Sequence, residues 1–244
     1  MAGFLYIVST PIGNSDDFTL RALSTLKAVA VIAAEDPQRT QALLARHDIT
    51  TPLTSYQNDN KEDKIPVLLQ RMQEGQSVAL VSDAGTPAIV DPGALLILEA
   101  LRRAIPVVSI PGPSAVLAAL AASGLSGDAF VFAGPLPARP STRRALLRSL
   151  CAERRTLVCF ESARRLPATL KTLRDEFGNR RIAVACNLTT PQEKWLRGTI
   201  DEIVRGRTAR AVGGELTLVI DGAQPERRTS RKRVKRAQLS RGAS

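Results

Sequence analysis

Histidine and cysteine are scarce in this chain of 244 residues, which has one of the former and three of the latter. His47 stands in a polar stretch typical of a helix end, so a Ser-His-Asp hydrolase is excluded. Cys151, Cys159 and Cys186 are too far apart for a CxxC pair, and we interpret them as reduced thiols. Because histidines and cysteines do not cluster, the sequence predicts no metal site.

Long apolar runs are also lacking. The run at residues 4–8 is too short for a signal peptide, and no basic segment precedes it. No stretch approaches the roughly 18 apolar residues that a membrane-spanning helix needs. We therefore expect a soluble, cytoplasmic protein that does not enter a membrane.

Positive charge is abundant and unevenly placed along the chain. The net charge is +11, and residues 225–244 hold eight Arg or Lys against one acidic residue, a balance of +7. The remaining 224 residues are therefore only mildly basic. We expect residues 225–244 to form a basic flexible tail, which would suit a phosphate-rich partner or serve only to keep the protein soluble.

Three short loops rich in glycine and proline each follow an apolar run that is typical of a strand. The loops cover residues 9–14, 82–87 and 111–115. Open α/β sheets bind small molecules at the carboxyl ends of parallel strands, where backbone N–H groups and helix N-termini converge. The three loops therefore predict one shared ligand cleft. Neither GxGxxG nor GxxxxGK[ST] occurs, so the cleft is not a standard dinucleotide or P-loop site.

The order of strand and helix patterns predicts an α/β fold with two α/β domains. Residues 1–123 alternate strand and helix, which favours a mostly parallel sheet. Residues 124–224 predict a mixed sheet, after a stretch at 134–140 that is too rich in proline for a helix or a central strand. The predicted strands of this part are 156–160, 181–186, 195–200 and 215–220, and its helices are 142–151 and 166–177.

Two helix starts are predicted at the ends of the loops. Asp91 precedes Pro92, a pattern typical of an N-cap before a first helical residue, and Ser114 precedes a run of small apolar residues. Carboxylates also follow several strands, at Glu35, Asp36, Asp83 and Glu161. Each is either a turn or capping residue or part of the cleft.

Seven short motifs together resemble the bacterial ribosomal RNA small subunit methyltransferase I family, which belongs to the tetrapyrrole-methylase-like (class III) methyltransferases. The motifs are residues 9–14, 33–36, 82–87, 91–93, 111–114, 160–162 and 214–215, and the resemblance spans roughly residues 4–222. It implies two α/β domains with S-adenosyl-L-methionine in the cleft between them. It also implies a homodimer that methylates the 2′-hydroxyl of a cytidine in the decoding region of 16S rRNA, within the 30S subunit.

The resemblance also implies site residues. Those expected at the cofactor are Thr10, Pro11, Ile12, Gly13, Asp83, Gly85, Thr86, Pro87, Ser114, Ala115, Phe160 and Thr217. A ribose hydroxyl loses its proton during transfer, and the carboxylates expected to accept it are Glu161, Glu193, Glu215 and Asp36, in that order. Aromatic residues make up only 4%, so we expect RNA contacts from arginine and lysine: Arg139, Arg143, Arg144, Arg164, Arg165, Arg231, Lys232 and Arg233.

Five positions depart from the family's usual residues and are expected to face the substrate: Pro37, Gln38, Arg164, Asn187 and Thr190. They keep two alternatives open. One is a homologue that binds cofactor and RNA without turnover. The other is a methylase of a tetrapyrrole or another small molecule, although such a substrate has no use for the basic tail.

Overall fold

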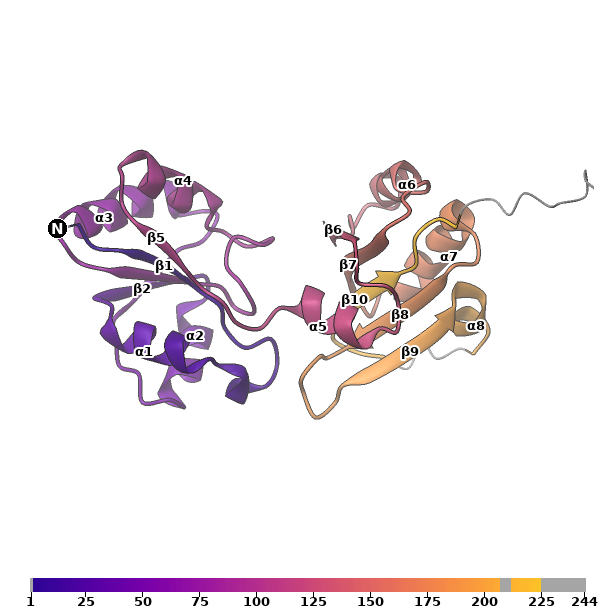
Figure 1. Cartoon of the computed structure of the whole chain (residues 1–244), viewed down its shortest axis with the longest axis horizontal. Coiled ribbons are helices and arrows are strands. Elements are labelled where there is room, and N and C mark those ends of the chain that lie inside the picture. The colour runs from indigo at the N-terminus through magenta and orange to yellow at the C-terminus, as the bar shows by residue number, and fades with distance from the viewer. Residues whose placement is uncertain (1, 207–211, 225–244) are drawn as a thin grey trace, which may run out of the picture.

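Two five-stranded sheets stand next to each other in the computed structural model, which describes residues 2–206 and 212–224 (Figure 1). The basic segment at 225–244, with Arg231, Lys232 and Arg233, lies outside the described residues. The first sheet contains β1 (Leu5–Val8), β2 (Val31–Ala34), β3 (Leu53–Ser55), β4 (Val78–Val81) and β5 (Val107–Ile110). The second contains β6 (Phe130–Pro135), β7 (Thr156–Ser162), β8 (Arg181–Cys186), β9 (Lys194–Thr199) and β10 (Glu215–Ile220).

The first sheet is parallel throughout, in the order β3-β2-β4-β1-β5. Its strands are short, and all four residues of the apolar strands β2 and β4 are buried. Such continuous apolar strands are expected where helices cover both faces of a parallel sheet. The carboxyl ends of β1, β4 and β5 therefore lie together at one edge, and the three loops leave from there.

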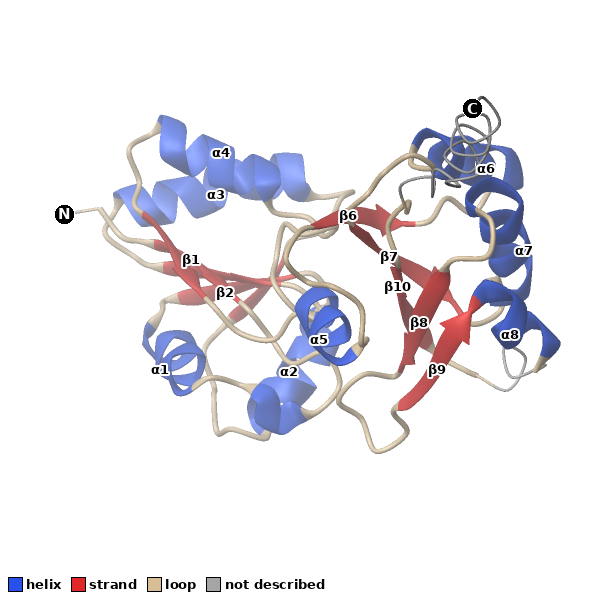
Figure 2. Ribbon diagram, turned by 45° about the vertical axis from the view of Figure 1, so that its right-hand side comes forward, coloured by secondary structure: helices blue, strands red, loops and turns tan. Residues whose placement is uncertain are grey.

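Helices cover both faces of this sheet (Figure 2). On one face α1 (Leu20–Ala28) and α2 (Pro37–Ala45) bury Leu26 and Leu44 against Ile32. On the other face α3 (Lys61–Gln73) and α4 (Ala94–Arg102) bury Leu69 and Leu96 against the sheet. A short 3-10 turn, η1 (Ser15–Asp17), precedes α1.

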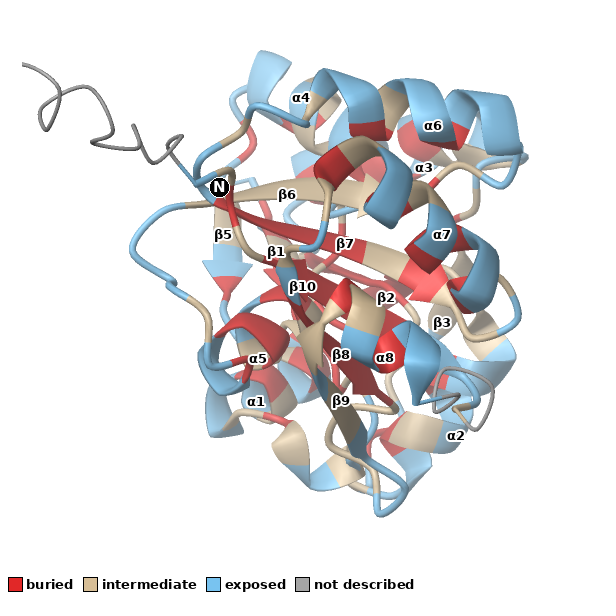
Figure 3. Cartoon of the chain, turned by 90° about the vertical axis from the view of Figure 1, so that its right-hand side faces the viewer, coloured by how far each residue is buried: buried red, intermediate tan, exposed pale blue. Residues whose placement is uncertain are grey.

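The second sheet has the order β6-β7-β10-β8-β9 and is mixed, because β6 pairs parallel to β7 while the other neighbours are antiparallel. One face carries α6 (Pro140–Ser149), α7 (Leu166–Phe177) and α8 (Ile200–Arg205). Strands β7, β8 and β10 are buried beneath them (Figure 3). The other face carries α5 (Ala115–Ala122), whose Val116, Ala119 and Leu120 pack on β7, β8 and β10.

The α/β fold with one parallel and one mixed sheet is confirmed. The bounds of α7, β8 and β10 are those predicted, whereas β6 was not predicted. Pro135 ends β6, which is an edge strand, and an edge tolerates a residue that has no N–H to donate. Asp91 is not the cap of α4, since Gly93 takes that position without a side-chain hydrogen bond. The division after residue 123 stays a proposal; α5 precedes it but packs on the second sheet.

Candidate functional site

A cavity of about 660 Å³ opens between the carboxyl edge of the first sheet and strands β7 and β10 of the second. One wall comes from the loops after β1, β4 and β5 and from the start of α5. The opposite wall comes from β7, β10 and the residues that lead into α7. The residues that line the two walls include Ser9, Ile12, Glu35, Arg39, Asp83, Gly85, Thr86, Asp91, Gly112, Ser114, Ala115, Phe160, Glu161, Arg165, Glu215 and Thr217.

The loops after β1 and β4 are joined to each other. Thr10 N donates to Gly85 O at 2.9 Å, and Gly85 N donates to Thr10 O at 3.0 Å. The hydroxyls of Ser9 and Thr86 lie 2.8 Å apart and share a hydrogen bond. Gly85 has φ +81°, a left-handed conformation that costs glycine little and other residues more. The two loops therefore form one fixed surface at the cavity floor.

The third loop approaches the first closely and then starts a helix. A Cβ at Gly112 would lie 2.8 Å from Ser9 Cβ, so a side chain there would push the two loops apart. Ser114 caps α5, and its hydroxyl accepts a hydrogen bond from Leu117 N at 3.4 Å. The positive N-terminal end of α5 consequently lies at the cavity wall, where Ser114 and Ala115 line it.

Three carboxylates, Glu35, Asp83 and Asp91, line the first wall. Burial, with the negative charges of Glu35 and Asp83 nearby, raises the pKa of Asp91 from 3.8 to about 6. Burial also raises the pKa of Glu35. Arg39 stands 3.7 Å from Asp83 and offsets part of this negative charge. The wall therefore favours a ligand that carries a positive charge.

The second wall joins an aromatic ring to a buried ion pair. Phe160 and Thr217 are directly paired across β7 and β10, and both line the cavity. Next to them Glu161, with a fully buried side chain, forms an ion pair at 2.6 Å with Arg165, which also lines the cavity. An apolar ring beside a fixed cation can hold a flat ligand and an anionic one side by side.

Most residues predicted to bind the cofactor come together in this cavity, namely Ile12, Asp83, Gly85, Thr86, Ser114, Ala115, Phe160 and Thr217. Pro11 and Gly13 line a smaller adjoining hollow of about 260 Å³, which Ile12 and Asp83 share. Thr10 lies behind the wall, where its hydroxyl donates to Ser82 O at 3.1 Å. Pro87 is also absent from the described lining of both cavities.

The four carboxylates predicted to accept a proton separate into two groups. Glu161 and Glu215 line the cavity. Asp36 instead caps α2, where its carboxylate accepts from Gln38 N at 2.9 Å and Arg39 N at 3.1 Å. Glu193 lies in the turn between β8 and β9 and accepts from Thr189 N at 2.7 Å. Both of the latter carboxylates are therefore occupied by backbone groups away from the cavity wall.

The predicted RNA-binding arginines also lie in different surroundings. Arg143 is 4% exposed and donates to the carbonyls of Pro137 and Ala138, so it holds the chain before α6 in place. Arg139 and Arg164 are exposed. Only Arg165 among the described candidates lines the cavity.

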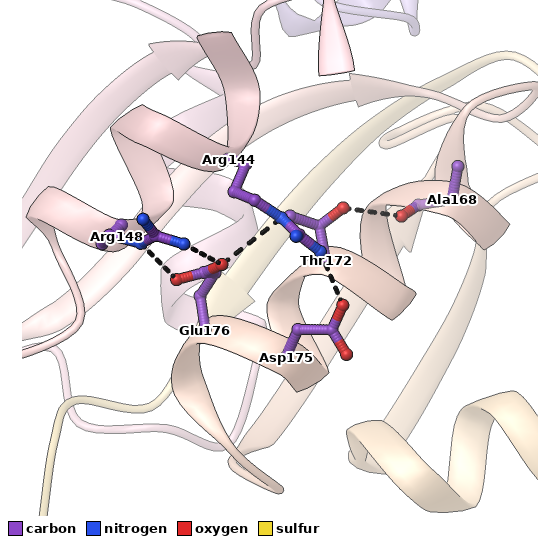
Figure 4. Close-up of polar contacts among 6 residues, drawn as sticks. All are labelled: Arg144, Arg148, Ala168, Thr172, Asp175 and Glu176. Carbon is purple, nitrogen blue, oxygen red and sulfur yellow. Dashed lines mark hydrogen bonds and ion pairs between the residues drawn. The ribbon is translucent and has the colours of Figure 1, made fainter. Parts of the chain in front are cut away.

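Arg144 belongs to an ion-pair network between α6 and α7 (Figure 4). Its guanidinium lies 2.8 Å from Asp175 and 3.4 Å from Glu176, and Arg148 lies 3.0 Å from Glu176. The two arginines are thus balanced by two carboxylates on the neighbouring helix. Arg144 therefore ties α6 to α7 in this structure.

Several residues of the wall were not predicted as site residues, including Ser9, Arg39 and Asp91. The pattern Asp91-Pro92 is typical of a helix cap, which hid the role of Asp91 in the wall. Ser9 could have been predicted from its position, because it directly follows β1 at the edge where the loops meet. Nothing local in the sequence marks Arg39, because its place depends on how α2 packs.

The described residues contain no group of three or more His, Cys, Asp or Glu that could hold a metal ion. Within the same part of the chain, no helix combines the length and apolarity required to cross a membrane.

Five residues expected to face the substrate are not among the described residues that line the cavity. They are Pro37, Gln38, Arg164, Asn187 and Thr190.

Comparison with known proteins places the chain in a family. The family model for Tetrapyrrole (Corrin/Porphyrin) Methylases matches residues 4–204. Ribosomal RNA small subunit methyltransferase I of Synechocystis sp. is 46% identical over 229 residues, covering 93% of this chain and 82% of that protein. The protein of the same name from Thermotoga maritima is 43% identical, covering 91% of this chain and 100% of that protein.

A solved structure shares the fold. Uroporphyrin-III C-methyl transferase of Thermus thermophilus, complexed with S-adenyl homocysteine, superposes with a TM-score of 0.61 at 21% identity, covering 90% of this chain and 97% of that chain. This likeness shows the fold, and the family model and the relatives show the family. The chain belongs to the tetrapyrrole (corrin/porphyrin) methylase family and, within it, to the ribosomal RNA small subunit methyltransferase I family.

Proposed function

We propose that this protein transfers a methyl group from S-adenosyl-L-methionine to the 2′-hydroxyl of a cytidine in the decoding region of 16S rRNA. The observation that carries the proposal is the cavity itself, in which three strand-end loops face Phe160 and Thr217. The methyltransferase family and its S-adenosyl-L-methionine dependence are given by the relatives. The cytidine and the ribose position are proposed from the resemblance of the sequence motifs.

The residues present fit this methyl donor. The cavity volume of about 660 Å³ lies within the range of roughly 300–1,000 Å³ that small-molecule sites occupy. The carboxylates of Glu35, Asp83 and Asp91 suit the positively charged sulfonium and ammonium groups of the donor. Gly85 and Gly112 let backbone approach closely at the floor. When bound, the donor supplies a methyl group activated by its sulfonium.

The protein's own contribution is to orient the incoming hydroxyl and take up its proton. Alignment of reacting groups can lower a barrier by about 7–11 kcal/mol in favourable cases. Glu215 is the better proton acceptor of the two carboxylates in the cavity, because it is exposed and no described residue donates to its carboxylate. Both oxygens of Glu161 are already bonded. We therefore propose Glu215 as general base.

The five departures from the usual family residues do not argue against turnover. Pro37 and Gln38 begin α2, and Thr190 donates its hydroxyl to Asn187 O at 2.8 Å within the turn after β8. Since neither these four residues nor Arg164 appear in the described cavity wall, the groups proposed to hold the donor are unchanged. We therefore favour an active enzyme over a homologue that only binds RNA.

We also propose, from the family resemblance, that the protein acts as a homodimer in the cytoplasm on the 30S subunit. Sedimentation equilibrium of the purified protein tests the dimer, and fractionation of cells that carry a tagged chain tests the location. A mass of one chain at micromolar concentration would refute the dimer. Recovery of the tagged chain with membranes would refute the location.

Methyl transfer is tested with 30S subunits from a strain that lacks its own enzyme. Purified protein and labelled S-adenosyl-L-methionine should label the 16S rRNA, and nucleoside mass spectrometry should show 2′-O-methylcytidine. A base-methylated nucleoside would contradict the ribose assignment. Cofactor binding without label in RNA would favour the RNA-binding alternative, and label in a tetrapyrrole instead would favour the small-molecule one. In the same assay, Glu215→Gln should lower kcat by about 100-fold or more.

A further inference from the structure

Glu161 is the most heavily bonded carboxylate of the cavity wall. Its Oε1 forms an ion pair with Arg165 Nη2 at 2.6 Å and accepts a hydrogen bond from Ser162 N at 2.7 Å. Its Oε2 accepts from Thr169 Oγ1 at 2.6 Å, and Thr169 is fully buried. A carboxylate whose two oxygens already contact three donors has few lone pairs left to accept a substrate proton.

The contacts around Glu161 hold the guanidinium of Arg165 in one position. Arg165 Nε also donates to Ser162 Oγ at 3.2 Å, so two sides of the guanidinium are held. The Arg165 side chain is 24% exposed, and it lines the cavity beside Phe160. No described residue accepts a hydrogen bond from its Nη1. The remaining N–H donors are therefore available to a ligand in the cavity.

We infer that Arg165 binds a phosphate of the RNA strand that enters the cavity, and that Glu161 is the residue that positions it. This inference rests on the proposed function. A guanidinium presents paired N–H groups that match a phosphate in a fork, and fixing it beforehand lowers the entropy lost on binding. Arg165 stands on the wall opposite the three loops, so a phosphate held there leaves the loops free for the donor.

The loop wall is the less favourable place for a phosphate, although the opposite wall also holds Glu215 and the Glu161 that pairs with Arg165. Glu35, Asp83 and Asp91 make the loop wall acidic, which disfavours an RNA phosphate there. Arg165 lies on the other wall, at the N-cap position of α7, where the helix end adds partial positive charge. The carboxylate of the donor has similar chemistry to a phosphate. The experiment therefore measures donor and RNA binding separately.

The test compares Arg165→Gln and Arg165→Lys with wild type, and uses Arg174→Gln as the control. Arg174 also lies on α7 and pairs with Asp201 at 2.6 Å, but it does not line the cavity. Binding of 30S subunits is measured by filter binding across a salt series, and S-adenosylhomocysteine binding by calorimetry. Both binding measurements need no methyl transfer, so the variants can be compared with wild type even if wild type transfers no methyl group. Failure of the inference is therefore distinguished from failure of the proposed function.

For Arg165→Gln we expect about tenfold weaker 30S binding, a salt slope smaller by about one phosphate contact, and an unchanged affinity for S-adenosylhomocysteine. Arg165→Lys should keep the salt slope but lose part of the affinity, because a lysine cannot form the fork. Arg174→Gln should match wild type in all three measurements. An unchanged 30S affinity and slope in Arg165→Gln overturns the inference, as does weaker cofactor binding with intact 30S binding.

Glu161→Gln tests the positioning role. The amide keeps the shape but loses the charge that holds the guanidinium, so 30S binding should weaken nearly as much as in Arg165→Gln. The double variant should be no weaker than the worse single variant, since both changes remove one contact. Fully additive losses would contradict the role of Glu161. If Glu161→Gln unfolds the protein, Thr169→Val is used in its place in the comparison of single and double variants, because it removes one hydrogen bond from the same carboxylate.

Discussion

Thr10 and Gly85 exchange two backbone hydrogen bonds, at 2.9 and 3.0 Å, and so join the loops after β1 and β4 into one unit. Neither bond belongs to the sheet itself. The pairing holds only while Gly85 keeps φ +81°. Since Ser9, Ile12 and Thr86 stand on the joined loops and line the cavity, this bridge, with the hydrogen bond between the Ser9 and Thr86 hydroxyls, sets the shape of the floor.

Replacing Gly85 with valine should therefore weaken donor binding sharply. A β-branched residue in the left-handed region costs about 1–2 kcal/mol or more, which the loop relieves by breaking the bridge. Calorimetry with S-adenosylhomocysteine should show at least tenfold weaker binding. Gly178→Val is the matched control, because Gly178 has φ +74° at the end of α7, away from the cavity. Equal binding losses in the two variants would show a general stability effect instead.

Asp91 should make the unliganded protein sensitive to pH. Its pKa is raised from 3.8 to about 6 by burial and by the charges of Glu35 and Asp83. A raised carboxyl pKa favours the protonated form in the folded state, so the free energy of unfolding falls as the pH rises from 3.8 to about 6. Asp91→Asn should remove this fall and be more stable than wild type above that range. Urea titrations at several pH values measure it, and curves that stay parallel would contradict the assignment.

The same carboxylate should affect the affinity for the charged donor in the opposite direction. Ionised Asp91 attracts a sulfonium or ammonium group, so binding should strengthen about threefold to fourfold between pH 5.5 and 7.5. Asp91→Asn should bind more weakly and with a flatter pH profile. Asp128→Asn, in the loop before β6, serves as the control. A profile for Asp91→Asn as steep as that of wild type would assign the dependence to another group.

Arg143 should contribute to stability and not to RNA binding. It is 4% exposed and donates to two backbone carbonyls at 3.2 and 3.3 Å. Arg143→Met should lower the free energy of unfolding by about 1–3 kcal/mol and leave the salt slope of 30S binding unchanged. Arg139→Gln, at an exposed position four residues earlier, should leave the free energy of unfolding unchanged and make the salt slope of 30S binding smaller. A smaller salt slope in Arg143→Met would restore Arg143 as an RNA contact.

Removal of residues 225–244 should weaken binding to the 30S subunit. The segment carries eight Arg or Lys and one acidic residue. Each phosphate contact that is lost lowers the slope of log K against log salt by about 0.7 to 0.9. We expect a clearly flatter slope with unchanged cofactor affinity. Identical slopes for the full and shortened chains would show that this segment makes no phosphate contacts.

Much of the fold is predictable because its patterns are local. Apolar runs such as 181–186 and 215–220 are strands with those bounds, and the period of residues 166–177 makes a helix. Strand β6 escaped prediction because Gly134 and Pro135 are poor strand residues that only an edge position tolerates. The packing of α5 on the second sheet could not be predicted from its own sequence, which is apolar all round.

The parts of the site formed by loops could be predicted from the sequence. The roles of side chains that depend on hydrogen-bond partners from other elements could not. Glycine and proline mark the loops at 82–87 and 111–115, and most of the predicted cofactor residues line one cavity. Glu161 was expected to act as a base because its sequence gives no sign that Thr169 and Arg165 occupy both of its oxygens. Arg143 was expected on the surface for a similar reason. Burial and pairing across elements decide these roles.

The central claim is that one cavity between the two sheets holds the methyl donor. A crystal structure of the protein with S-adenosylhomocysteine tests it most directly. We predict that the sulfur lies within the cavity, among Ile12, Thr86 and Ser114 on one side and Phe160 on the other. Electron density for the ligand on a different surface, with these four residues out of contact, would contradict the account.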